Sequence, residues 1–285
     1  MKKKTKKKIR TNPVRILVFI IFSLYTFSML YAFFWAITAS LNEHVALVLD
    51  GLALPKKLHF ENYIQAFKVL KTSSASFFDM LWNSIWLTVV NSILSLITMT
   101  MTGYVWARYD FVGKKTIIAI YLLSTLLPVY GSQASTLRLY INLGMYNSPL
   151  IVLKSLSALG MMTLVIKTFF QNIPMAYEES AQLDGASRWC VFWRIHIPMV
   201  KSSLFAMFIM MFIGGWNDYG LSIYYLPDYP TISSGLFVYE TMSKFAMNKP
   251  VYFAGVIMCA IVPMILFSLF SDKLATNISV GGLKG

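Results

Sequence analysis

Six apolar runs, each close to twenty residues long, restrict this chain more than any other feature of its sequence. We place them at about 14–40, 80–106, 116–137, 149–170, 202–225 and 251–270, with the third interrupted by Pro128 and Gly131. A helix needs about twenty apolar residues to cross the hydrocarbon core of a bilayer. With 57% hydrophobic and 13% charged residues, the chain also carries too little charge to cover a surface that faces water. The sequence therefore predicts an all-α integral membrane protein with six transmembrane helices.

Basic residues predict how these helices are oriented. Six lysines and an arginine crowd the first ten residues, and further basic residues lie between the second and third runs and between the fourth and fifth. Cytoplasmic loops carry the excess of Lys and Arg, so we expect both termini on the cytoplasmic side. The chain then divides into a basic tail that contacts anionic lipid, a six-span domain and a C-terminal tail, at 1–13, 14–270 and 271–285.

A polar segment at 171–201, between the fourth and fifth runs, predicts two short helices joined by a tight turn. Pro174 suits the first turn of a helix, because its φ angle is already helical and no needed N–H is lost. Gly185 is a stop signal, since glycine adopts the left-handed conformation that closes a helix. Ser187 can cap a second short helix, which Pro198 is expected to end. The segment would form a helix–glycine–helix elbow on the cytoplasmic face.

The same segment resembles a known motif. It reads E-E-S-A-x-x-D-G-A-S from Glu178, followed by I-x-I-P at 195–198, and is similar to the cytoplasmic EAA loop of ABC-importer permeases. That family has the type I importer fold, and its loop docks into a cleft of a cytoplasmic ATPase and transmits the motion of that ATPase. The resemblance implies that ATPase coupling falls to Glu178, Glu179, Ser180, Ala181, Asp184, Gly185, Ile197 and Pro198.

A second motif, Trp216-Asn217-Asp218-Tyr219, lies towards the end of the fifth run. Trp216 lies about 21 Å from Ser202 along a helix that rises about 1.5 Å per residue, which is past the bilayer midplane. An aspartate at that depth should face the bundle interior or a watery cavity. The pattern W-N-[DE]-[FY] resembles the carbohydrate class of ABC permeases, in which this span lies near the substrate path. Alternatively, the two aromatic residues belong to an interfacial belt and Asp218 caps a helix.

Polar residues inside the other runs are further candidates for a substrate path. Asn91, Ser95 and Thr98 recur at helical spacing and can share one face of a helix. Gln133 follows the interruption of the third run, and Lys154 lies in the fourth. Such groups often hydrogen-bond neighbouring helices in a membrane, and we expect that role first. The substrate-path candidates are Asn91, Gln133, Trp216, Asn217, Asp218 and Tyr219.

Shorter patches resemble the same class of permease. Asn62-Tyr63, Asn83-Ser84 and the sequence G-Y-V-W-A-R at 103–108 are similar to the sugar-permease pattern. The ending G-G-L-K-G at 281–285 is similar to that of the smaller maltose-type membrane subunit. The resemblance implies import of a sugar or oligosaccharide.

No catalytic constellation is visible in the sequence. The histidines, His44, His59 and His196, are scattered without metal-ligand spacing, and no phosphate-binding G-x-x-x-x-G-K-[ST] loop occurs. We therefore expect no enzymatic activity, no metal and no cofactor on this chain, with ATP and Mg bound by a separate ATPase.

The resemblance also implies an assembly in the bacterial plasma membrane. Its partners would be a second, similar permease, an ATP-binding cassette ATPase dimer, an extracellular substrate-binding protein and membrane lipid, with no nucleic acid. Two rivals remain open: an importer of the same kind for a non-sugar solute, and a secondary transporter that needs no ATPase. The second rival predicts internal repeats or several charged residues within the spans.

Overall fold

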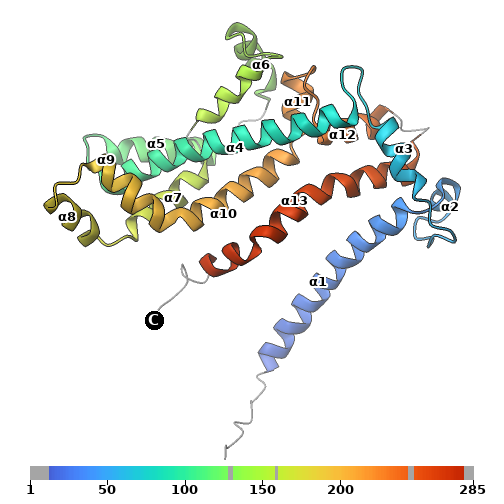
Figure 1. Cartoon of the computed structure of the whole chain (residues 1–285), viewed down its shortest axis with the longest axis horizontal. Helices are drawn as coiled ribbons and strands as arrows, with labels where there is room; N and C mark the ends of the chain where they lie inside the picture. Colours follow the sequence, from blue (N-terminus) through green and yellow to red (C-terminus); the bar gives the residue numbers. More distant parts are fainter. Residues whose placement is uncertain (1–12, 128–130, 158–159, 243–246, 279–285) are drawn as a thin grey trace, which may run out of the picture. The chain divides into compact units, whose positions relative to one another are not determined.

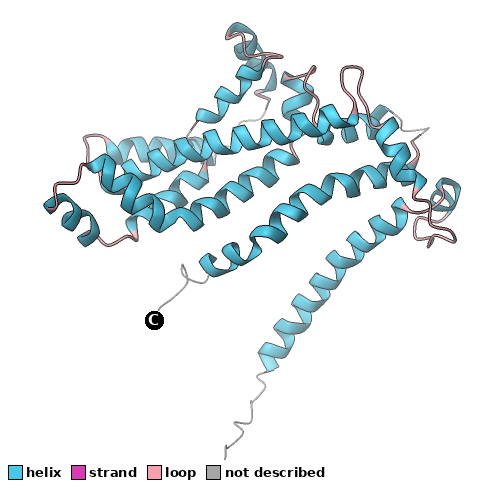
Figure 2. Cartoon of the chain, viewed as in Figure 1, coloured by secondary structure: helices cyan, strands magenta, loops and turns pink. Residues whose placement is uncertain are grey.

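The computed structural model describes residues 13–127, 131–157, 160–242 and 247–278. Every regular element in these ranges is a helix, as Figure 2 shows, and none is a strand, which confirms the all-α prediction. Residues 1–12 of the basic tail, Pro128 and the C-terminal residues 279–285 lie outside the described residues. The chain forms two compact units.

The first unit comprises Met1–Phe67 and Phe245–Ile257 and is built around the apolar helix α1 (Pro13–Ser40). Two short helices follow, α2 (His44–Leu49) and α3 (Glu61–Val69). The first part of α13 (Lys249–Ile278) also belongs to this unit. There the rings of Trp35 and Phe253 pack edge to face with centroids 5.0 Å apart.

Polar bonds connect the end of α1 to the start of α3. The side-chain amide of Asn62 donates to the carbonyl oxygens of Ser40 and Asn42, at 2.9 Å and 3.0 Å. The hydroxyl oxygens of Ser40 and Tyr63 lie 2.8 Å apart. Carbonyl groups at a helix C-terminus have no partner within the helix, so these bonds satisfy groups that would otherwise be unpaired. Asn62 and Tyr63 therefore have a local structural role.

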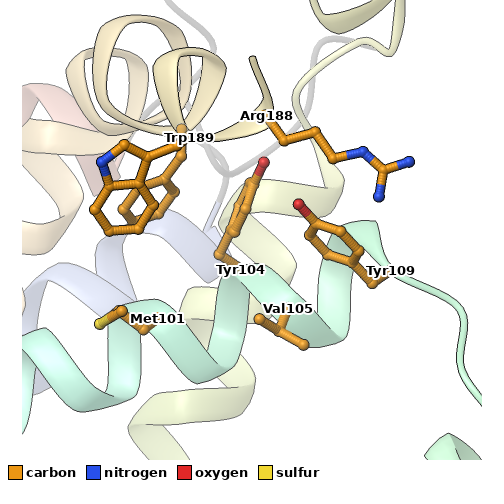
Figure 3. A pocket seen from close by; sticks show the side chains of 7 residues that line it. Met101, Tyr104, Val105, Tyr109, Arg188 and Trp189 are labelled. Carbon is orange, nitrogen blue, oxygen red and sulfur yellow. The ribbon is translucent and has the colours of Figure 1, made fainter.

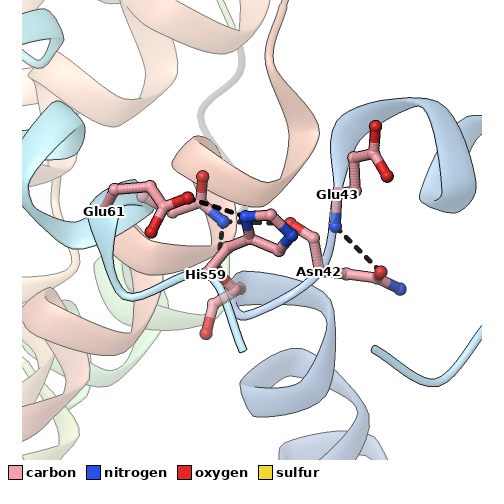
Figure 4. Close-up of polar contacts among 6 residues, drawn as sticks. Asn42, Glu43, His59 and Glu61 are labelled. Atoms are coloured by element: carbon pink, nitrogen blue, oxygen red, sulfur yellow. Dashed lines mark hydrogen bonds and ion pairs between the residues drawn. The ribbon is translucent and has the colours of Figure 1, made fainter. Parts of the chain in front are cut away.

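His59 pairs with Glu61, the first residue of α3. Figure 4 shows this pair beside Asn42 and Glu43. Nδ1 of His59 lies 2.7 Å from Oε1 of Glu61. The hydrogen bond from His59 holds the pKa of the Glu61 carboxyl below its ordinary value. The backbone N–H of Glu43 donates to Oδ1 of Asn42 at 2.8 Å. Local polar bonds thus shape the segment between α1 and α3.

The second unit comprises Lys68–Lys244 and Met258–Gly285 and is organised around α4 (Phe77–Arg108). A capping box begins α4: the backbone N–H of Ser76 donates to Asp79 at 2.9 Å, and the backbone N–H of Asp79 donates to Ser76 at 3.4 Å. In Figure 1, α4 lies beside α10 (Ile197–Trp216) and α7 (Met161–Gln171). It also packs against the 3₁₀-helix η1 (Pro149–Leu156).

The backbones of α4 and α7 approach closely at Gly103. A Cβ atom at this position would lie 2.9 Å from Cγ2 of Ile166 and 3.1 Å from the backbone nitrogen of Lys167. Small residues at helix contacts in membranes allow such an approach. The adjoining core contains Met99, Tyr104, Ile166, Phe170, Ile173, Phe192, Val200, Leu204 and Met207.

Four helices within the described residues are long and apolar enough to cross a membrane: Pro13–Ser40, Phe77–Arg108, Arg188–Trp216 and Lys249–Phe270. They lie at the predicted first, second, fifth and sixth spans. The bent pair of η1 and α7 lies at the fourth and would count as one more. At the third, α5 (Lys114–Leu126) and α6 (Gln133–Asn142) are each too short to cross alone. Six spans and their orientation stay predictions.

The predicted bounds of the fifth span, 202–225, are wrong at both ends. The helix already begins at Arg188 and ends at Trp216. The side-chain amide of Asn217 donates to the carbonyl oxygen of Ile213 at 2.8 Å, which satisfies one of the unpaired carbonyls at the end of the helix. Two separate helices follow, α11 (Gly220–Tyr225) and α12 (Ile232–Met242). The Trp-Asn-Asp-Tyr motif therefore lies where one helix ends and the next begins.

Candidate functional site

The elbow at 171–201, which we call the coupling loop, begins with α8 (Ala176–Leu183). α8 starts directly after Pro174, whose carbonyl oxygen accepts from the backbone N–H of Tyr177 at 3.4 Å. It ends in a Schellman motif: Gly185 has φ +81°, its N–H donates to Gln182, and the N–H of Ala186 donates to Ala181. The predicted helix stop at Asp184-Gly185 is confirmed.

The second helix of the coupling loop continues into the membrane-length helix without a break. The hydroxyl oxygen of Ser187 accepts from the backbone N–H of Cys190 at 3.2 Å, which confirms the predicted cap. α9 (Arg188–Val191) leads into a π-helical turn, η2 (Phe192–His196), and then into α10. The expectation that Pro198 ends the helix is wrong. Pro198 lies in the first turn of α10, where proline is tolerated, and the wider π turn precedes it.

The predicted coupling residues differ in exposure. Ala181 and Ile197 are half-buried, and the side chain of Glu178 turns inward with only 8% of the residue exposed. The remaining five lie on the exposed side of the loop: Glu179, Ser180, Asp184, Gly185 and Pro198. A protein that docks on this loop would meet these five residues.

Glu178 faces a histidine at the base of α10. Its Oε2 lies 3.5 Å from Nε2 of His196, and its Oε1 accepts from the side-chain amide of Gln182 at 3.3 Å. His196 is completely buried. Its ring packs against those of Tyr104 and Phe170, with centroids 5.1 Å and 6.0 Å away. No pattern in the sequence predicts this contact, because the two residues belong to different helices.

Arg108, the last residue of α4, joins the coupling loop to the rest of the bundle. Its guanidinium donates to the carbonyl oxygens of Phe170 and Ile173, at 2.7 Å and 2.6 Å, and contacts Sδ of Met175. A cation at the C-terminal end of α7 also interacts favourably with the helix dipole. A cavity of about 300 Å³ opens here, lined by Arg108, Tyr109, Asp110, Met175, Glu178, Glu179, Gln182 and Arg188.

Two further contacts lie at this end of α4. Lys114 donates to Asp110 at 2.9 Å and holds the pKa of that carboxyl below its ordinary value. Figure 3 shows an adjacent pocket of about 150 Å³ with a largely apolar lining, in which the guanidinium carbon of Arg188 lies 5.2 Å from the ring centroid of Tyr109. The pocket is lined by Met101, Tyr104, Val105, Tyr109, Arg188, Trp189 and Phe192.

A second, polar cavity of about 140 Å³ lies near the other end of α10. It contains one cationic and one anionic side chain, Lys154 and Asp218, together with amide and hydroxyl groups from neighbouring elements. The segments that contribute are α4, η1, the end of α10 and the region from 218 to 231. The lining residues are Leu87, Thr88, Asn91, Lys154, Ser155, Gly215, Asp218, Leu221 and Thr231.

The polar residues on one face of α4 form hydrogen bonds to other backbone and side-chain groups, as expected; they are Asn91, Ser95 and Thr98. Asn91 accepts a hydrogen bond from the hydroxyl of Ser155, and the hydroxyl of Ser95 donates to the Ser155 carbonyl oxygen at 3.1 Å. The hydroxyl of Thr98 donates within its own helix, to Leu94 at 2.9 Å. Asn91 thus both joins two helices and lines the polar cavity.

The candidate residues around α10 separate into different environments. Trp216 is 1% exposed, and its indole N–H donates to the carbonyl oxygen of Cys259 at 3.1 Å. Asp218 lines the polar cavity, and one of its carboxylate oxygens accepts from the backbone N–H of Leu221 at 3.1 Å. Trp216 is therefore a core residue, whereas the exposed Asp218 bonds to the first turn of α11 and lines the cavity.

Three other substrate-path candidates do not line this cavity. Tyr219 stacks on Phe237 with centroids 4.4 Å apart, and the exposed Asn217 caps α10. Gln133 is exposed at the start of α6 and does not line the polar cavity. Within the described residues, His, Cys, Asp and Glu side chains form no group of three or more that could hold a metal ion.

A family model described as "Binding-protein-dependent transport system inner membrane component" matches residues 101–279. The maltodextrin transport system permease protein MalD of Streptococcus pneumoniae is 31% identical over 206 residues, covering 68% of this chain and 72% of that protein. The arabinooligosaccharides transport system permease protein AraQ of Halalkalibacterium halodurans is 24% identical over 280 residues, covering 97% and 99%.

A solved structure has a similar fold. It is the crystal structure of a bacterial ABC transporter involved in the import of the acidic polysaccharide alginate. The matched chain superposes with a TM-score of 0.74 at 20% sequence identity, and the match covers 94% of this chain and 99% of that one. At this identity the likeness concerns the fold.

Proposed function

This chain belongs to the family of binding-protein-dependent transport system inner membrane components, and from this premise we propose that it is the permease subunit of an ATP-driven importer for a sugar or oligosaccharide. The observation that carries the proposal is the coupling loop, which presents five predicted contact residues at the base of a membrane-length helix. The relatives named above transport maltodextrin and arabinooligosaccharides, which supports a carbohydrate as the substrate.

The proposed assembly contains a second, similar permease, an ATPase dimer that binds ATP and Mg, and an external substrate-binding protein. A related solved structure is a bacterial alginate ABC transporter in complex with an alginate-bound periplasmic protein, which supports the last of these partners. We place the chain in the bacterial plasma membrane as a multi-pass protein with both termini inside. The basic tail would then contact anionic lipid.

The mechanism we propose is alternating access without covalent chemistry. ATP closes the ATPase dimer, the coupling loop moves with it, and the helices open a path to the external binding protein. The permease contributes two helix packings whose relative stability depends on the state of its partners. The continuous helix Arg188–Trp216 connects the coupling loop to the polar cavity, and this supports a mechanical connection between them.

The polar cavity is the proposed contact point for substrate within this subunit. Its hydroxyl, amide, ammonium and carboxylate groups can both donate and accept hydrogen bonds, as recognition of a hydroxyl-rich solute requires. Its volume of about 140 Å³ is small, so we expect it to contact part of a sugar rather than enclose one. A non-sugar solute is the alternative that a substrate screen would reveal.

A co-purification experiment tests the proposed function. We would extract the wild-type permease and its Glu179→Lys and Gly185→Trp variants from membranes, and measure the bound ATPase and its activity. Both substitutions lie on the exposed side of the loop, so we expect the ATPase or its stimulation to be lost. The wild-type complex in vesicles should take up labelled oligosaccharides with ATP. A wild-type chain that purifies alone and transports without ATP would contradict the proposal.

A further inference from the structure

We infer that Glu178 and His196 act as positioning residues, a buried pair through which movement of α8 reaches the base of α10. This inference rests on the proposed function and concerns how force crosses the coupling loop. It separates Glu178 from Glu179, although the two acids are neighbours in one helix and belong to the same motif. In this interpretation Glu179 contacts the ATPase and Glu178 contacts only this chain.

Burial separates the two glutamates. Successive residues of an α-helix point about 100° apart, since a turn contains about 3.6 residues. Glu179 is accordingly exposed on the outer side of α8, whereas Glu178 is 8% exposed and points toward the bundle. Both glutamates line the cavity beside Arg108, but only Glu179 is exposed, so a partner that docks on α8 would contact Glu179 more fully than Glu178.

The polar atoms of Glu178 and His196 depend on each other. Oε2 of Glu178 lies 3.5 Å from Nε2 of His196, which is within ion-pair distance. Among the described residues, neither this oxygen nor either ring nitrogen of His196 has a hydrogen-bond partner. Burying such groups unpaired is costly, so each residue favours the position in which it faces the other.

Neighbouring residues of α4 and α7 hold the His196 ring in place at the start of α10. The His196 ring packs edge-on against Tyr104 of α4 and Phe170 of α7. Arg108 binds the carbonyl oxygens of Phe170 and Ile173 nearby. His196 is the last residue of the π turn, directly before α10, so a force on its ring acts on the start of the long helix.

The covalent connection between the two helices of the loop runs through an exposed turn. It passes through Gly185, where a Cβ atom would meet no heavy atom within 4 Å. The turn is exposed from Gln182 to Gly185. α8 also contacts α9, and the Glu178–His196 pair links α8 directly to the residue preceding α10.

A double-mutant cycle in the complete importer tests this inference. The complexes would contain wild type, Glu178→Gln, His196→Gln and the double variant, with Glu179→Gln as the matched control. Each would be placed in vesicles with its ATPase and binding protein. Three quantities would be measured: bound ATPase, ATP hydrolysis, and sugar taken up per ATP hydrolysed.

We expect Glu178→Gln to keep its ATPase while uptake per ATP falls at least about fivefold, the lower end of typical coupling between sites. His196→Gln should behave alike, and the double variant should lose no more than either single variant, because the two side chains share one route. Glu179→Gln should instead lose bound ATPase, while the complexes that remain keep their uptake per ATP.

Three results would overturn the inference: loss of the ATPase from Glu178→Gln, unchanged uptake per ATP, or losses that multiply in the double variant. A wild-type complex without ATP-driven uptake would instead count against the proposed function. The unfolding midpoint of each purified permease is a second measurement on the same four proteins of the double-mutant cycle. Additive shifts at positions 178 and 196 would overturn the pair even where uptake cannot be measured.

Discussion

The coupling loop and the polar cavity lie near opposite ends of α10, and they are assembled in different ways. The loop takes its exposed residues from one continuous segment, 171–201, closed by its own caps. The cavity takes its lining from segments that extend from Leu87 to Thr231. A docking surface can be built from one segment, whereas a cavity between helices needs several helices in register. The difference suggests that the two regions can be changed independently.

The substitution with the largest expected effect breaks this separation by disturbing both regions. In Gly103→Leu the new side chain would collide with Ile166 and with the backbone of Lys167, so α7 must move away from α4. Such overpacking costs about 3 kcal/mol. We expect a lower unfolding midpoint in detergent, weaker ATPase binding and weaker uptake. Gly214→Ala is the control, because a Cβ atom there meets nothing within 4 Å; equal midpoints for the two variants would contradict the prediction.

The next substitution should affect the coupling loop alone. Arg108→Met removes the bonds to the carbonyl oxygens of Phe170 and Ile173, and a bond to a charged group contributes about 1.5–3 kcal/mol. We expect uptake per ATP to fall while the KM for sugar is retained. Lys115→Met removes an exposed basic residue close by and serves as the control. A change in KM without loss of coupling would show that the two regions are not separate.

A substitution in the cavity should show the opposite pattern. Asp218→Asn keeps the side-chain volume and removes the charge from the cavity lining. Losing one hydrogen bond to a charged group would raise the KM for sugar about tenfold, with bound ATPase unchanged. The control, Asn217→Ala, changes an exposed neighbour that does not line the cavity. If both variants leave uptake unaltered, the substrate does not contact this cavity.

The smallest effect is expected in the loop after α1, which belongs to neither region. The pKa of Glu61 is lowered by the hydrogen bond from His59, so its stabilising contribution is present above the ordinary carboxyl pKa. That contribution is lost as the pH falls through the lowered value. Wild type should therefore lose slightly more thermal stability on acidification than Glu61→Gln, with coupling and KM alike in both. A larger loss in the variant would reverse the sign and contradict the assignment.

The sequence predicted the parts of the molecule whose cause is local. The stop at Gly185 and the cap at Ser187 depend on a few neighbouring residues, and both are confirmed. Whether Pro198 ends the helix could not be predicted from its neighbours, because the preceding π turn accommodates it within a continuous helix. The predicted start of the fifth span was wrong for the same reason, whereas its predicted end was wrong because the helix stops at Trp216.

Contacts between helices were beyond the sequence patterns. The sequence marks Asn91 and Asp218 as separate candidates for the substrate path, and the structure brings both into one cavity. Gln133 was chosen on the same grounds and lies elsewhere. The contact of Glu178 with His196 depends on the distance between two helices, which no spacing along the chain reports.

The continuity of the helix from Arg188 to Trp216 has a geometric consequence. With 29 residues, this helix is about 43 Å long at about 1.5 Å per residue. A tilt of about 10° at its base would carry its far end sideways by about 7 Å, which exceeds the pitch of one helical turn. In the proposed mechanism, a small swing of the coupling loop would thereby become a displacement large enough to part side chains across the bundle.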